Sequence, residues 1–205
     1  MASLPQTAAP DAVRQIRRVQ TITIAWMSVE ATVSLFSAVQ AHSPALLAFG
    51  GDSAVELLSA VVVLWRFRAS AAHDSTERLA TRITGALLFA VAALVALISA
   101  LNLLGYSEPK PTVIGIAVLV AAGVIMPWLA REKRRLSAVA ASAALRADAA
   151  ESALCAYLSG IALVGLGMNA IWHFRWADPI AALVILPLVI WEGRETMRGK
   201  ACGCC

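Results

Sequence analysis

Unbroken apolar runs dominate this 205-residue sequence, and they restrict its fold more than any other feature. Hydrophobic residues make up 60% of the chain and charged residues 15%, whereas a soluble domain is roughly half apolar and a quarter charged. A helix needs about 20 apolar residues to cross the hydrocarbon core of a bilayer. We therefore predict an all-α polytopic membrane protein with six transmembrane helices, at about 20–41, 44–65, 83–106, 112–130, 140–168 and 178–191.

The lysines and arginines indicate how these helices are oriented. Fifteen of the 17 lie in the N-terminal segment, around the second and fourth connections, or in the C-terminal segment, and only Lys110 and Arg175 lie elsewhere. Because cytoplasmic loops of membrane proteins are enriched in basic residues, both termini are predicted to be cytoplasmic. This distribution accounts for the net charge of +4, so the charge does not indicate a nucleic-acid partner.

The chain divides into three expected segments: a disordered cytoplasmic tail at 1–13, a six-span membrane domain at 14–198 and a cysteine-rich cytoplasmic tail at 199–205. The first residues are polar and basic without an apolar core, so we expect no cleavable signal peptide. The residues after the last run are too few to bury a core of their own. No nucleophile–base pair is visible, and we expect neither enzymatic activity nor a resident cofactor.

Acidic residues inside the apolar runs are the first functional signal. A carboxylate at membrane depth costs a few kcal/mol, so such groups usually face the interior of a helix bundle and serve a function. One isolated acid is equally compatible with a protonated group in a helix–helix hydrogen bond. The runs contain five acids, arranged in stripes, and this favours an ion site: Glu30, Asp52, Glu56, Asp148 and Glu151.

The spacing of these acids predicts a metal site between the second and fifth spans. Asp52 and Glu56 are four residues apart on one helix face, and so are Glu151 and Cys155 on another. Two helices that each offer an i, i+4 pair can close four donors around one ion. Oxygen and thiolate ligands in a tetrahedral arrangement suit zinc.

Two further groups are expected to support this site. Asp148 lies on the stripe of Glu151, and we place it, with Glu30, next to the ligands or on a proton path. For Glu30 the roles of proton carrier and fifth ligand also stay open. The tail thiols Cys202, Cys204 and Cys205 are candidates for metal capture, with acylation or no role as alternatives.

Three stretches resemble the cation diffusion facilitator family. Gly51–Glu56 resembles its D-S-x-x-D motif, and Leu145–Cys155 resembles its fifth-span pattern R-A-D-x-x-H-x-x-x-D. Trp172–Pro179 is similar to the family's entry into the sixth span. The resemblance places the transport site on the same four residues. Glu151 stands where histidine is common and Cys155 where aspartate is common, and the thiol shifts the expected preference toward softer ions.

The resemblance implies export of a divalent metal from the cytoplasm, by alternating access with proton antiport. Zinc is the expected ion, and cadmium, cobalt and iron are alternatives. It also implies a homodimer in the bilayer of a bacterial inner membrane, while the family's cytoplasmic C-terminal domain is expected to be absent. The alternative hypothesis is a membrane metal or redox sensor that uses the cysteine tail and transports nothing.

Overall fold

The computed structural model describes residues 10–68, 74–140 and 143–197. These residues form six helices, and the described part contains no strand. In chain order the helices are α1 (Pro10–Ala41), α2 (Pro44–Arg68), α3 (Asp74–Leu103), α4 (Val113–Val139), α5 (Ala143–Trp172) and α6 (Ala177–Met197). Each predicted span corresponds to one helix. α1 begins at Pro10, inside the segment 1–13 that was expected to be disordered, and residues 1–9 lie outside the described residues.

The length and polarity of the helices suit a bilayer. Four of them contain segments long and apolar enough to cross a membrane: Val13–Ala41, Gly85–Leu103, Val113–Val139 and Asp148–Trp172. α2 and α6 have 25 and 21 residues, which correspond to roughly 37 and 32 Å of helix. Large apolar side chains such as Phe36, Val124 and Val164 are exposed on the outer faces, where lipid would contact them. The prediction of an all-α polytopic membrane protein is confirmed.

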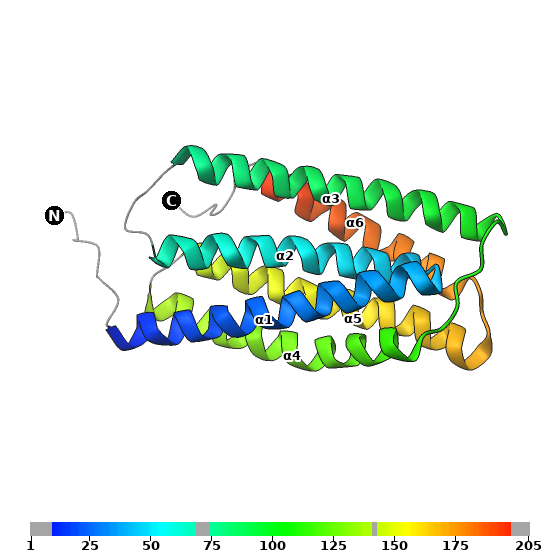
Figure 1. Cartoon of the computed structure of the whole chain (residues 1–205), viewed down its shortest axis with the longest axis horizontal. Helices are drawn as coiled ribbons and strands as arrows, with labels where there is room; N and C mark the ends of the chain where they lie inside the picture. The colour runs from blue at the N-terminus through cyan, green and yellow to red at the C-terminus, as the bar shows by residue number, and fades with distance from the viewer. Residues whose placement is uncertain (1–9, 69–73, 141–142, 198–205) are drawn as a thin grey trace.

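The helices pack as pairs, and α2 lies at the centre of their arrangement. α1 packs along α2, α4 along α5, and α3 along α6. α2 also contacts α3, α5 and α6, while α1 contacts α4. Figure 1 shows the α3–α6 pair along one side of the other four helices. A polar group on the inner face of α2 or α5 is therefore surrounded by protein.

Glycine allows the closest approach between α1 and α2. A Cβ on Gly50 would lie 2.9 Å from Ser34 Cβ and 3.0 Å from the backbone nitrogen of Leu35. Helices in membranes approach closely where small residues lie at their interface. Gly50 thus brings the acid of α1, Glu30, near the polar face of α2.

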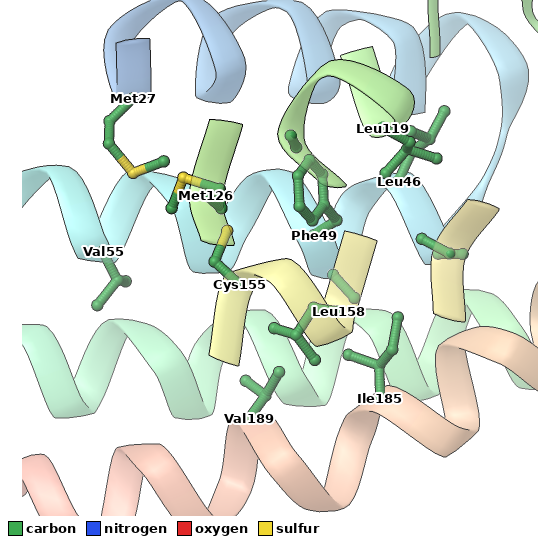
Figure 2. Packing of buried hydrophobic residues seen from close by; sticks show 14 of the residues in the cluster. Met27, Leu46, Phe49, Val55, Leu119, Met126, Cys155, Leu158, Ile185 and Val189 are labelled. Atoms are coloured by element: carbon green, nitrogen blue, oxygen red, sulfur yellow. The ribbon is translucent and has the colours of Figure 1, made fainter. Parts of the chain in front are cut away.

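An apolar cluster fills the space between α1, α2, α4, α5 and α6. Figure 2 shows Met27, Phe49, Met126, Leu158 and Val189 converging from these five helices. Cys155 lies among them. Cys155, one of the candidate ligands, is therefore set in a close-packed apolar core, which limits the access of water to it.

The even number of helices brings both ends of the described chain to one end of the bundle. In Figure 1 α1 starts at the left and α6 runs toward that side, where α4 also ends and α5 begins. The basic residues Arg131, Arg134 and Arg135 are exposed near this end. The charge distribution predicts that this end faces the cytoplasm.

Candidate metal site

The inner face of α2 carries two acids that are almost completely buried. Asp52 and Glu56 lie one helical turn apart, and each is 4% exposed. Glu56 Oε2 has no hydrogen-bond partner among the described residues. A buried acceptor without a partner costs about 1–3 kcal/mol. This oxygen is therefore available to a cation.

Asp52 makes its main polar contact with a residue of α6. Its carboxyl group shares a hydrogen bond with that of Glu192. Glu56 and Glu151 are also electrostatic neighbours of Glu192. Four carboxyl groups from α2, α5 and α6 thus lie within electrostatic reach of one another. A hydrogen bond between two carboxyl groups needs one proton, because an ionised carboxylate can only accept.

Cys155 makes its hydrogen bond with Glu30, while Glu56 and Asp52 are its electrostatic neighbours. The thiol is completely buried, and its Sγ donates to Glu30 Oε1 at 3.4 Å. Ser53 Oγ donates to the same oxygen at 2.7 Å and lies 3.9 Å from the thiol. Glu30 Oε2 has no hydrogen-bond partner in the described part of the chain. Glu30, expected to act next to the ligands, is therefore in direct contact with one of them.

Glu56 is connected to α4 and α5 through a serine. Ser152 Oγ donates to Glu56 Oε1 at 2.6 Å, and Lys133 Nζ donates to Ser152 Oγ at 2.7 Å. The ammonium group of Lys133 also lies 3.8 Å from Glu56 Oε1. Glu56 therefore faces a buried positive charge on one side and the acids of α2 and α6 on the other.

Asp148 holds the lysine in place. Its Oδ1 accepts from Lys133 Nζ at 3.1 Å, and its Oδ2 accepts from Gln20 Nε2 at 2.6 Å. All three side chains are 0–1% exposed. With both oxygens occupied, Asp148 neutralises Lys133 and joins α1, α4 and α5. The expected role of Asp148 beside the ligands or on a proton path stays a prediction.

Glu151 is partly buried and belongs to the same group of acids. In the part of the chain that the structure describes, no three histidine, cysteine or acidic side chains are already arranged to hold one metal ion. The proposed ligands are instead paired within the protein, Asp52 with Glu192 and Cys155 with Glu30. One ion can be bound by all four proposed ligands only after these side chains rearrange.

Two residues of this site were not singled out in the sequence. Lys133 was counted among the basic residues of a connection, and Glu192 lies just beyond the sixth apolar run. Helical periodicity identifies both. Lys133 continues the buried stripe of Met126 and Leu129 on α4, and Glu192 continues the stripe of Ile185 and Val189 on α6.

Residues 21–199 match the family described as the cation efflux transmembrane domain. The chain belongs to the cation efflux family. The members of this family are transporters, and the six helices of this chain correspond to the transmembrane domain of the family. The resemblance inferred from the motifs at Asp52 and Asp148 is therefore confirmed.

Three curated relatives of this cation efflux chain come from two bacteria, Synechocystis sp. and Bacillus subtilis. An uncharacterized transporter of Synechocystis sp. is 27% identical over 169 residues, which cover 76% of this chain and 53% of the relative. The manganese efflux system protein MneS of Bacillus subtilis is 25% identical over 173 residues, covering 80% and 59%. The uncharacterized transporter YdbO of the same organism is 26% identical, covering 76% and 56%. The chain thus spans somewhat more than half the length of these relatives.

The cysteine tail was the remaining part of the predicted site. Cys202, Cys204 and Cys205 lie outside the described residues, so their proposed role in metal capture stays a prediction.

Proposed function

We propose that this cation efflux protein exports a divalent metal ion from the cytoplasm through a site formed by Asp52, Glu56, Glu151 and Cys155. The observation that carries the proposal is the gathering of buried acids around the inner face of α2. Acids at membrane depth that face a bundle interior mark ion pathways. We place the protein in a bacterial inner membrane, a localisation that is compatible with the Synechocystis relative.

Proton exchange is the second part of the proposal. A hydrogen bond between the carboxyl groups of Asp52 and Glu192 requires one proton, because an ionised carboxylate can only accept. Metal ligands must be deprotonated, so coordination by Asp52 releases this proton. Return of the proton from the outer side would then favour release of the metal. Export against uptake of protons follows from this order of events.

The donor atoms favour zinc, manganese is added as a second candidate, and cadmium, cobalt and iron stay alternatives. Zinc is the expected ion if the thiolate of Cys155 coordinates, because zinc accepts both sulfur and oxygen ligands. Manganese is the second candidate, because carboxylate oxygens suit it and the cluster around α2 is rich in them. One relative is named a manganese efflux protein. We propose a homodimer in line with the family resemblance.

The test is flux into vesicles. The purified protein is reconstituted into liposomes that contain a metal-sensitive dye, and zinc or manganese is added outside under an imposed pH gradient. Asp52→Asn keeps the size of the side chain and removes its charge, and we expect flux to fall by roughly 100-fold, the upper end of the cost of disturbing a metal site. Glu132→Gln, on the partly exposed face of α4, is the matched control and should transport normally.

Two results would contradict the proposal. If the unsubstituted protein moves neither ion, export of these metals is excluded as its function. If folded Asp52→Asn protein transports at the normal rate, the site is wrongly assigned. The sensor hypothesis predicts the first result together with metal binding that depends on the tail cysteines.

A further inference from the structure

Lys133 is the most unusual charged residue of the described chain. Among the lysines and arginines whose side chains the structure describes, it is the only buried one, with 0% exposure. Its neighbours Arg131, Arg134 and Arg135 are all exposed. A buried lysine is strongly unfavourable unless it is paired. Lys133 therefore occupies a site built to receive a cation.

The receiving site has one dedicated acid and one shared acid. Asp148 is dedicated, because its Oδ1 binds Lys133 at 3.1 Å and its Oδ2 binds Gln20 at 2.6 Å. Glu56 is shared: it lies 3.8 Å from the ammonium group, and Ser152 connects the two through bonds of 2.7 and 2.6 Å. Glu56 is also a proposed metal ligand. Lys133 and a metal ion would thus act on the same carboxylate.

The position of Lys133 along the bundle gives this competition a direction. Lys133 lies in the last two turns of α4, which ends at Val139, and Asp148 lies in the second turn of α5. Both are near the end that the charge distribution places in the cytoplasm, and α2 runs toward that end from Asp52 to Glu56. With that orientation, Lys133 and Glu56 lie nearer the cytoplasmic end of the bundle than Asp52 does.

We propose that Lys133 is a tethered cation that competes with the metal for Glu56 and thereby sets the affinity of the site for cytoplasmic metal. This proposal rests on the proposed function. The ammonium group neutralises part of the charge of Glu56 when no metal is bound to it. A divalent ion must displace this contact and bind against the repulsion of the lysine. Affinity is thereby reduced, and a bound ion is released more easily.

Two variants test the competition between Lys133 and the metal ion for Glu56: one should strengthen it and the other should abolish it. Asp148→Asn removes the dedicated acid and leaves Glu56 as the only acid in contact with Lys133, so the lysine competes more strongly. Lys133→Met combined with Asp148→Asn removes both charges, keeps side chains of similar size and keeps an acceptor for Gln20. Arg134→Met removes a positive charge from the adjacent, exposed position and is the control.

The measurement is the dissociation constant of zinc and of manganese for the full chain in lipid nanodiscs, by titration calorimetry. We expect the constant to rise by about tenfold in Asp148→Asn and to fall by about tenfold in the double variant, since a unit charge near 4 Å from a buried carboxylate is a strong interaction. Arg134→Met should bind like the unsubstituted protein. A purely structural lysine would instead weaken binding in both variants or change neither.

A failure of this proposal can be distinguished from a failure of the proposed function. If the unsubstituted protein binds neither ion, the proposed function itself is wrong. If it binds them, and the two variants do not shift in opposite directions, the competing role of Lys133 is overturned while the proposed function stands. If the double variant does not fold, Lys133→Gln combined with Asp148→Asn takes its place, because glutamine also removes the charge and can still donate to Ser152; its dissociation constant should again fall below that of the unsubstituted protein, and a rise in both variants would overturn the competing role.

Discussion

Asp52 on α2 and Glu192 on α6 lie within hydrogen-bonding reach of each other, so that one proton can bridge the two helices through their carboxyl groups. Glu192 belongs to the helix pair α3–α6, whereas Asp52 belongs to the helix that contacts both this pair and α1. The proton therefore lies at the junction of two parts of the bundle. A metal ion that takes its place would join the same two parts.

Glu192→Gln tests the origin of the released proton. The amide of glutamine can still donate to Asp52, but no proton is shared between two acids. We expect the number of protons released per metal bound to fall by about one. A pH indicator in weakly buffered detergent solution measures this number, and Glu108→Gln in the exposed outer connection is the control. Equal release from the Glu192→Gln and unsubstituted proteins would exclude this carboxyl pair as the source.

Cys155→Ser tests whether the thiol coordinates the metal. Serine keeps a donor for Glu30 Oε1 and is close to cysteine in size. A thiolate ligand contributes most to soft ions, so we expect cadmium affinity to fall by roughly tenfold or more while manganese affinity hardly changes. Ser159→Ala, one turn further along α5, is the control, because its hydroxyl bonds only to the carbonyl of Ala156. An equal loss for both ions would mean that Cys155 serves packing alone.

Glu30→Gln separates the roles left open for this acid. Its Oε1 accepts from Ser53 and Cys155, and a glutamine oxygen can accept both hydrogen bonds. For a residue that supports the ligands or carries protons, we expect flux to fall by about tenfold with an unchanged metal dissociation constant. Vesicle flux and calorimetry on the same preparation provide both numbers. A weaker dissociation constant would instead identify Glu30 as a ligand.

Gly50→Ala tests the close contact between α1 and α2. The added Cβ would lie 3.0 Å from the backbone of Leu35, which cannot move aside as a flexible side chain can. We expect a loss of about 1–3 kcal/mol in stability, as for overpacked cores. Gly160→Ala is a matched control on α5, since no atom lies within 4 Å of its added Cβ. Thermal unfolding in detergent compares the two variants. Equal unfolding temperatures would show that the α1–α2 interface accommodates the added methyl group without loss of stability.

The fold could be predicted from sequence because the bilayer enforces it. Apolar runs of sufficient length must become helices, and each predicted run corresponds to one of the six. The predicted helix ends differ most from the observed ones at the end of the bundle that is predicted to face the cytoplasm. α4 continues from Leu129 through its charged segment to Val139, because its buried stripe also continues there.

The site could be predicted only in part. The i, i+4 rule places Asp52 and Glu56 correctly on one face, because that relationship lies within a single helix. Which helices face each other is a tertiary property, so the pairing of Cys155 with Glu30 and of Asp52 with Glu192 could not be read from spacing. Lys133 was missed for another reason: a charged segment was interpreted as a solvated loop, although one of its residues points inward.

The bond between Gln20 and Asp148 has a consequence for the biosynthesis of the protein. The two residues are 128 positions apart in the chain, so at common rates of translation roughly 6 to 26 seconds separate their synthesis. Glu30 obtains Ser53 as a partner only 23 residues later. The first two helices can therefore pack against each other early, whereas Gln20 has no bond to Asp148 until the fifth helix has been synthesised and inserted. During that interval the polar side chain of Gln20 lacks its partner on α5, although α1 already has α2 to pack against.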